Sequence, residues 1–467
     1  MFAVEGHGMI AAEPGSRIYR PVIRAMGLSS AGALASGLLS AAAIKILATV
    51  GGPAALATLT TLQQLRQAAV AGATGNGQTA LVRGTSALTG LEQTEYVRTV
   101  LCVFGAATSA VALSMMVFPR TLAKAAGIGA GASHMIPWLA VAVIFTSILV
   151  FASALLNSLR AIGKLAAVSA MGSAAMMLGA WPAARAFAGG SPNALVGLLI
   201  FSSAAGCALA VGALLPFREQ IAGWLRGPGR WWDTGAARNF GAMSGAMLAS
   251  GLAASGTLLA VRAHITAMQG PAVTGQFDAA WGLSMNQVTL VLSSLQTYYL
   301  PELARTRGAA QRAAHVSSVL TVATLTAAVA ITAIALLKPW LLTAFYSAAF
   351  RPAAAYLRWT LLGDYLKVTS WILSIPIMAA GDMKMFLAAD LAAYGVFLAV
   401  ASGLSPLVTA AAGAAVAFVA MYAAHLMLCA VYLWRRWRFV PARRAMAAWV
   451  AGLGVVMAAS ALTWGQT

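Results

Sequence analysis

Five cationic side chains interrupt the long apolar runs of this sequence: Lys45, Arg66, Arg262, Arg358 and Lys367. A cation at the centre of a membrane-spanning helix costs about 2.5–3.5 kcal/mol on insertion scales. Such residues therefore face a wet cavity, pair with an acid or extend to the membrane interface. Arg358 fits the interface, because it lies near a predicted helix end. The other four are predicted to line a cavity.

The chemistry expected of such a cavity is the binding of an anion. Arg66 stands beside Gln63, Gln64 and Gln67, and a polar cluster of this kind cannot face lipid. Cations in excess over acids attract anions, and the low-dielectric walls of a cavity strengthen the attraction. The planar fork of arginine holds two oxygens of a phosphate at once. The residues therefore predict a translocated phosphate or pyrophosphate.

A few acids lie near these cations and are expected to support them. Asp364 precedes Lys367 by three residues, so the two share one face of a helix and can pair. Asp278 and Asp390 are candidate counter-charges or proton-coupling groups.

The elements that must position these residues are membrane-spanning helices. The 467 residues are 60% hydrophobic and only 9% charged, and apolar windows of about 20 residues recur from end to end. The fold class is therefore an all-α polytopic membrane protein of about twelve transmembrane helices, with a possible thirteenth C-terminal apolar helix. The expected spans are 25–49, 54–75, 96–118, 135–156, 165–184, 194–216, 240–263, 277–300, 315–337, 354–379, 385–404, 410–433 and, as the extra helix, 445–464.

The charge pattern gives the orientation of these spans. Twenty of the 30 Lys and Arg fall on segments that share one side of the membrane, whereas five fall on the other: Arg120, Lys124, Arg185, Lys338 and Arg351. Because cytoplasmic loops carry the excess of Lys and Arg, the N-terminus is expected in the cytoplasm of a bacterial cell, with the chain in the inner membrane. Topology also accounts for most of the net charge of +19, so no nucleic-acid partner is implied.

The chain divides into two halves of six spans. The expected segments are a cytoplasmic tail 1–24, an N-terminal lobe 25–216, a connector 217–239 at the membrane surface, a C-terminal lobe 240–433 and a basic, then apolar segment 434–467. A weak repeat links the halves, because Lys45 precedes Gly52-Pro53-Ala54 much as Arg262 precedes Gly270-Pro271-Ala272. This pattern is typical of transporters built from two parallel repeats.

No enzyme chemistry is visible in the sequence. The three cysteines lie apart inside apolar runs, and the five histidines are scattered, so neither a disulfide framework nor a metal site is expected. There is no P-loop and no nucleophile elbow. A non-enzymatic protein without a cofactor is the expectation.

Several stretches resemble one transporter family. They are Lys45-Ile46-Leu47-Ala48 with Gly52-Pro53-Ala54 and Gln64-Leu65, then Tyr299-Leu300-Pro301-Glu302-Leu303-Ala304-Arg305, then Trp359-Thr360-Leu361-Leu362-Gly363-Asp364-Tyr365-Leu366-Lys367-Val368, and Leu433-Trp434-Arg435-Arg436. Over about residues 25–436 the chain resembles the Wzx-type oligosaccharide-lipid flippases of the multidrug/oligosaccharidyl-lipid/polysaccharide (MOP) exporter superfamily, which move O-antigen and enterobacterial common antigen units. The resemblance implies two six-helix lobes around a V-shaped cavity. It also implies that an undecaprenyl-pyrophosphate-linked oligosaccharide is turned from the cytoplasmic to the periplasmic leaflet.

The resemblance implies site residues as well as a fold. Lys45, Arg262, Asp364 and Lys367 fall where such proteins also carry charge. The apolar segment after residue 444 and the long tail before Arg24 depart from the family pattern.

Three alternatives compete with a flippase. A drug or small-molecule exporter of the same superfamily would bind cations and would place acids in the cavity. A membrane enzyme of glycan assembly would need larger outer loops than the short ones expected here. A non-transporting scaffold would not explain Arg66 and Lys367 inside spans.

Overall fold

The computed structural model describes residues 35–127, 133–159, 161–285, 309–380, 382–404 and 406–463. The expected tail 1–24 and the stretch Tyr299–Arg305 lie outside these residues. Every regular element in the described part of the chain is helical. After a first helix, Ala35–Val50, the longer ones are α2 (Gly52–Thr74), α4 (Gly90–Val117), α6 (Met135–Ser158), α7 (Ile162–Ala188), α8 (Asn193–Leu214), α10 (Thr234–Gln269), α12 (Ala309–Phe345), α13 (Ala354–Ala379), α14 (Met383–Leu404), α15 (Ala410–Trp437) and α16 (Arg443–Leu462).

The helices confirm the expected polytopic membrane fold. Nine of those in the described residues are long and apolar enough to cross a bilayer, and residues 271–285 begin a further helix where the eighth span was expected. The helices α2 and α13 have a similar length but fall outside that group. They are the helices that carry the polar cluster around Arg66 and the charges of Asp364 and Lys367.

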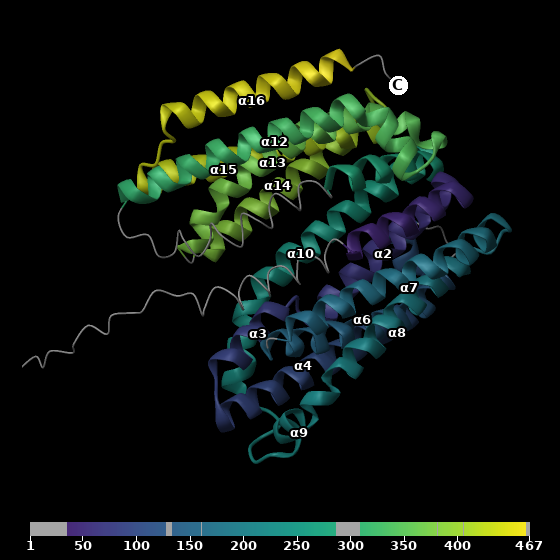
Figure 1. The fold of residues 1–467 in the computed structure, drawn as a ribbon, viewed down its shortest axis with the longest axis vertical. Helices are drawn as coiled ribbons and strands as arrows, with labels where there is room; N and C mark the ends of the chain where they lie inside the picture. Colours follow the sequence, from purple (N-terminus) through teal and green to yellow (C-terminus); the bar gives the residue numbers. More distant parts are fainter. Residues whose placement is uncertain are drawn as a thin grey trace, which may run out of the picture.

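The helices form two sets joined by α10 (Figure 1). The N-terminal set comprises the first helix, α2, α4, α6, α7 and α8, with the short helices α3 (Gln78–Ala87), α5 (Pro119–Ala125) and α9 (Arg218–Arg226). The C-terminal set comprises residues 271–285 and α12 to α16. Within the sets the tightest packing joins α7 to α8 and α13 to α15.

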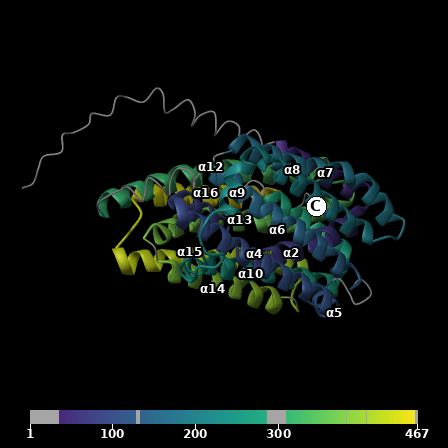
Figure 2. The ribbon, with the colours of Figure 1, turned by 90° about the horizontal axis from the view of Figure 1, so that it is seen from below.

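The helix α10 contacts both sets along its length. Near its start, Ala236 and Phe240 join a buried cluster with Tyr96 and Phe104 of α4. Near its end, Val261 joins a cluster of the C-terminal set. Figure 2 shows α2, α4 and α10 close together, in agreement with their packing. The predicted start of the C-terminal lobe at residue 240 falls inside α10, and this helix contacts both sets.

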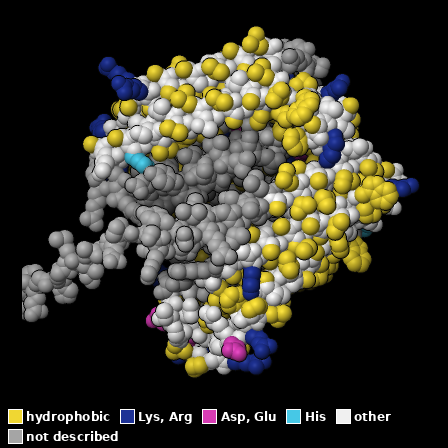
Figure 3. Space-filling model, in the orientation of Figure 1, with side chains coloured by type: hydrophobic (Ala, Val, Ile, Leu, Met, Phe, Trp, Pro, Cys, Tyr) yellow, Lys and Arg dark blue, Asp and Glu magenta, His cyan; other side chains and the backbone are white. Residues whose placement is uncertain are grey.

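Apolar side chains cover the visible outer faces of both sets, and Lys and Arg lie mostly at the margins (Figure 3). Large apolar residues such as Trp138, Leu178, Phe201 and Val329 are more than half exposed. An exposed apolar surface of this extent suits contact with lipid. The chain is a multi-pass membrane protein.

A buried arginine fixes the connector between the two halves. Arg98 of α4 is only 2% exposed, and its guanidinium donates to the carbonyls of Trp224, Gly229 and Gly227 at 2.7, 2.9 and 2.5 Å. It also lies 5.1 Å from the ring centroid of Trp231. The charge pattern places Arg98 among the twenty cations of the segments predicted to be cytoplasmic. The structure instead buries it, because the connector folds back over α4 and supplies oxygen acceptors.

We expect Arg98→Ala to loosen the connector. The change leaves three carbonyls without their charged donor, and each such hydrogen bond contributes about 1.5–3 kcal/mol. Arg98→Lys should rescue only in part, because an ammonium cannot reproduce the fork. Hydrogen exchange over residues 217–233 measures the effect, with exposed Arg226→Ala as control. Unchanged exchange in Arg98→Ala would contradict the assigned role.

The extra C-terminal helix is present and packs on the outside of the C-terminal set. α16 lies along α12 and contacts α13, and its length and hydropathy suit a span. Tyr365 donates to the carbonyl of Trp449 at 2.8 Å. Lys338 was expected in an outside loop, but it lies in α12 and donates to the carbonyl of Thr463 at 2.7 Å. The unpaired carbonyls at the C-terminal end of α16 attract a cation, which explains why Lys338 lies against this helix end and not in a loop.

The two Gly-Pro-Ala stretches form the same kind of joint. Gly52 and Gly270 have φ of +70° and +84°, which favours glycine, and each is followed by proline near the start of a helix. The two joints also meet, because a Cβ on Gly275 would clash with the backbone of Pro53. This end of the molecule, predicted to be periplasmic, is called the outer end below. The repeat also predicts that Lys45 and Arg262 occupy equivalent places in the two helix sets, and this stays a prediction.

Candidate functional site

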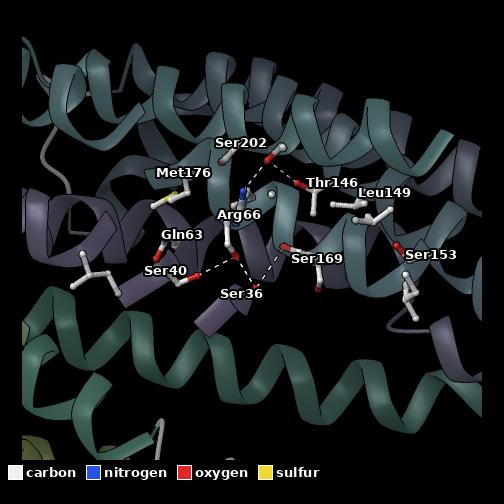
Figure 4. Close-up of a pocket in the computed structure, with 16 residues that line it drawn as sticks. Ser36, Ser40, Gln63, Arg66, Thr146, Leu149, Ser153, Ser169, Met176 and Ser202 are labelled. Atoms are coloured by element: carbon white, nitrogen blue, oxygen red, sulfur yellow. Dashed lines mark hydrogen bonds between the residues drawn. The ribbon is translucent and has the colours of Figure 1, made fainter. Parts of the chain in front are cut away.

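The clearest candidate site is a polar cavity inside the N-terminal set. It has a volume of about 350 Å³ and lies between the first helix, α2, α6, α7 and α8. Figure 4 shows Arg66 and Gln63 from α2 facing hydroxyl groups on the surrounding helices. The Arg66 guanidinium donates to Ser203 at 2.8 Å, and Thr146 donates to the same hydroxyl at 3.1 Å. Of the described residues that line the cavity, Arg66 is the only charged one.

Arg66 also borders a second cavity of about 290 Å³. This one lies toward α3 and α10, and Gln67, Asn76 and Ser255 are among its lining residues. Its lining holds no acid either, among the residues that the structure describes. The guanidinium therefore stands at the junction of two polar spaces and can present its donors to an anion in either.

The sequence predicted the charged and amide residues of this site but not its hydroxyl groups. Six serines from the first helix, α7 and α8 line the larger cavity: Ser36, Ser40, Ser169, Ser173, Ser202 and Ser203. Ser36 and Ser40 both bond to Ser173, at 2.6 and 3.1 Å. The spacing of four residues in Ser36/Ser40 and Ser169/Ser173 puts each pair on one helix face, and this signal was available in the sequence. The hydroxyls suit an oxygen-rich ligand, because each can donate and accept.

Arg262 occupies a different environment, a buried ion pair toward the outer end. Its Nε lies 2.6 Å from Oδ1 of Asp278, and the two side chains are 6% and 0% exposed. Its NH1 donates to Gln64 of α2 at 3.3 Å. The hydroxyl of Thr60, also in α2, donates to the other oxygen of Asp278. The pair is thus satisfied on both sides and ties α2 to α10 and the helix of residues 271–285.

Lys45 lies in the same outer region and joins the two helix sets. Its ammonium donates to the carbonyl of Thr343 in α12 at 2.8 Å. The nearby hydroxyl of Thr49 reaches the carbonyl of Tyr346 at 3.5 Å. Together with the Thr60 contact to Asp278, these bonds join the two helix sets toward the outer end.

Asp364 and Lys367 lie inside the C-terminal set. Asp364 is fully buried and accepts from Ser284 at 2.6 Å. The ammonium of Lys367 lies 3.1 Å from the sulfur of Met285 and 5.4 Å from the ring centroid of Tyr422. The two charged residues are therefore held by consecutive residues of the helix that starts at residue 271.

The predicted site residues thus occupy three places. Arg66 lies with Gln63 and Gln67 at the N-terminal cavities. Lys45, Gln64 and Arg262 lie at the outer contact, and Asp364 and Lys367 lie in the C-terminal set. The polar cluster of α2 is divided between two of these places, because Gln63 and Gln67 line the cavities with Arg66 whereas Gln64 accepts from Arg262. A shared action of the four cations on one cargo stays a prediction.

Comparison with known proteins shows the fold of this chain. No protein-family model matches the chain, and no curated protein matches it. Among solved structures, "Lipid II flippase MurJ, inward closed conformation" is similar, with a TM-score of 0.67, 14% identity, and 92% of each chain covered. An "inward-facing conformation of a multidrug resistance MATE family transporter of the MOP superfamily" has a TM-score of 0.64 and 11% identity, with 91% of this chain and 94% of that one covered. The chain has the fold of the MOP superfamily transporters.

A third structure agrees with this MOP fold. A MATE protein in complex with MaL6 has a TM-score of 0.60 and 13% identity, with 95% of this chain and 96% of that one covered. All three proteins are named as flippases or as MATE proteins. At these identities the MOP fold is shared, while the cargo of this chain must be argued from its own residues.

Proposed function

We propose that this protein is a MOP-type flippase for an undecaprenyl-pyrophosphate-linked oligosaccharide. The cargo class includes the repeat units of O-antigen, enterobacterial common antigen and exopolysaccharides. The protein would move this cargo from the cytoplasmic to the periplasmic leaflet of the bacterial inner membrane. Its partners would be the bilayer and the glycan-assembly proteins that make and consume the cargo.

The observation that carries the proposal is that Arg66 borders two cavities in which no described lining residue is an acid. An arginine among hydroxyl and amide groups in a membrane protein attracts an anion strongly, because little water screens it. A pyrophosphate supplies several oxygens for the guanidinium and for the serine hydroxyls. The similarity to a structure named as a lipid II flippase supports a lipid-linked cargo for the same fold.

The cargo would pass through the protein in parts. The pyrophosphate would bind at Arg66, the sugars would occupy the polar cavities, and the lipid tail would stay in the bilayer. The outer contact made by Lys45, Arg262 and Asp278 would open when the two helix sets rock about α10. Arg262 and Lys45 would then be released to the cargo as it moves outward, and Lys367 would meet it from the C-terminal set.

A drug exporter is the second candidate, because two of the similar structures are MATE proteins. A cationic drug would need an acid in the cavity with unused charge. Asp278 is already neutralised by Arg262, and Asp390 accepts from Ser250 and lies against His425. The charges therefore favour an anionic cargo over a cationic one.

Complementation tests the proposal in cells. Strains that lack their own oligosaccharide-lipid flippase, each with a different glycan, would express this protein at matched membrane abundance. We expect surface glycan to return in at least one strain, and Arg66→Ala to reduce the return strongly. Full surface glycan with the double variant Arg66→Ala, Arg262→Ala would overturn the proposal.

A further inference from the structure

A dense cluster of cations lies between the last two helices of the chain. Residues 434–444, called the basic segment below, run from the end of α15 to the start of α16. They include five exposed arginines: Arg435, Arg436, Arg438, Arg443 and Arg444. Figure 3 shows dark blue side chains at the corner where α16 begins. This corner lies at the edge of the C-terminal set, apart from α2 and the cavities around Arg66 (Figure 1).

The described part of the fold does not neutralise these arginines. None of the five forms an ion pair with a described residue. A nearby acid is Asp382, whose carboxylate accepts from the Tyr432 hydroxyl and from the Met385 amide. Two cations, Arg436 and Lys384, already lie close to this carboxylate. The basic segment therefore keeps a large excess of positive charge.

The start of α16 adds to this excess. Arg443 and Arg444 open the helix, where the helix dipole disfavours cations. The first turn carries no acid, and Ala442 before it has no side chain that could cap the helix. Two arginines at this position are thus unfavourable in the protein alone, and an anion from outside the chain would relieve the repulsion.

The backbone of the basic segment is fixed by contacts. Arg438 has φ of +51°, a left-handed conformation that is uncommon outside glycine, and its amide donates to the carbonyl of Trp434 at 2.9 Å. The Ala442 amide donates to the hydroxyl of Ser317 in α12 at 3.0 Å. Phe439 packs against the core of the C-terminal set. The segment is therefore a built turn that holds its arginines together at the surface.

Aromatic side chains place the basic segment at the level of lipid headgroups. Trp434 and Trp437 are 49% and 37% exposed, and the Arg438 guanidinium lies 5.6 Å from the ring centroid of Trp434. Indole rings favour the interface between membrane and water. Farther along α16, Met446 and Val450 are exposed apolar residues one helical turn apart. A ligand that fits both parts has an anionic head and apolar tails.

We propose that the basic segment binds an anionic phospholipid of the surrounding bilayer, such as phosphatidylglycerol. The phosphate would accept from the arginine forks, and the acyl chains would lie along the exposed face of α16. Clusters of Lys and Arg directly beside a membrane-spanning helix attract anionic lipids in this way. The end of the molecule that carries the segment is the one predicted to be cytoplasmic. The proposal concerns binding of a bilayer lipid and does not depend on the cargo.

The test locates the lipid on the protein. The full chain is placed in phosphatidylcholine nanodiscs that contain a small fraction of a photoreactive lipid, either a phosphatidylglycerol or a phosphatidylcholine analogue. After illumination, mass spectrometry of peptides identifies the labelled residues. We expect the phosphatidylglycerol analogue to label residues 434–450 more strongly than the phosphatidylcholine analogue does. Equal labelling by the two would overturn the proposal.

Removal of charge from the basic segment should remove the preference. Each cation near an anionic surface contributes a factor of about five to binding. The triple variant Arg435→Gln, Arg438→Gln, Arg443→Gln should therefore lower the preference for phosphatidylglycerol by about a hundredfold. The same three positions changed to Lys should keep most of it, because the charge remains. A loss as large with Lys as with Gln would contradict the role of charge.

A matched control changes three exposed cations elsewhere on the same predicted side of the membrane. Arg218→Gln, Arg226→Gln, Arg230→Gln lies in the connector and leaves the basic segment intact. It should label residues 434–450 as the wild type does. An equal loss of preference in this control would show a general effect of net charge and would overturn the assigned site.

Competition separates a bilayer phospholipid from other phosphates. Inorganic phosphate should displace the analogue poorly, because it has no tails for the face of α16. Undecaprenyl pyrophosphate should also displace it poorly, because the segment lies apart from the cavities around Arg66. Complete displacement by either compound would overturn the proposal. Each measurement is made without transport, so its outcome leaves the proposed flippase function to its own test.

Discussion

Arg66→Ala is expected to reduce cargo flipping by about ten- to a hundredfold. A hydrogen bond to a charged group contributes about 1.5–3 kcal/mol, and each 1.4 kcal/mol corresponds to a factor of ten. Among the described residues that line the two cavities, the guanidinium is the only charge, so no neighbour among them can replace it. Flipping rates in reconstituted vesicles measure the effect.

Two further variants separate the role of the charge from that of its position. Arg66→Lys should retain part of the activity, since it keeps the charge and loses the fork. Ser203→Ala should have a smaller effect than Arg66→Ala, because it removes one partner of the guanidinium and leaves the charge. Exposed Arg120→Ala is the control for the loss of a surface cation. Wild-type flipping in Arg66→Ala would show that the cavity does not bind the cargo.

Asp278→Asn is expected to have the largest effect on stability. It leaves the Arg262 guanidinium buried beside a neutral amide, and breaking a buried ion pair in this way typically costs about 3–5 kcal/mol. Arg262→Gln should be costly for the complementary reason. The double variant Arg262→Gln, Asp278→Asn should recover a large part of the loss, because neither charge then remains buried alone.

The unfolding of each variant in mixed detergent measures this cycle. Thr60→Val is the matched control, because it removes a single hydroxyl donor from Asp278 and leaves the ion pair intact. If the double variant lost as much stability as the two single variants together, the result would contradict the pairing. In vesicles the single variants should also flip cargo more slowly, since the pair belongs to the contact that opens in the proposed rocking motion.

The sequence predicted the helices well because each span had to satisfy its backbone hydrogen bonds internally. All the expected spans coincide with helices where the structure describes them, including α16. The helices extend beyond the apolar windows, as α10 does, because polar residues continue a helix past the membrane boundary. The length of each helix was therefore harder to predict than its position along the chain.

The site was harder to predict because it depends on contacts between distant residues. The sequence indicated that Arg66 had to avoid lipid, and the structure places it at two cavities. It did not indicate that Arg262 would meet Asp278, because i,i+16 spacing across a helix joint carries no fixed geometry. The partnership of His425 with Asp390 was invisible for the same reason, since α14 and α15 come together only through packing.

Transport by the purified protein tests the central claim most directly. Vesicles that contain the wild type or Arg66→Ala would be loaded either with a fluorescent undecaprenyl-pyrophosphate-linked oligosaccharide or with a cationic dye. The account predicts that the wild type moves the lipid-linked oligosaccharide, that Arg66→Ala moves it at least about tenfold more slowly, and that neither moves the dye. A wild type that exports the dye and leaves the lipid-linked oligosaccharide in place would contradict the account.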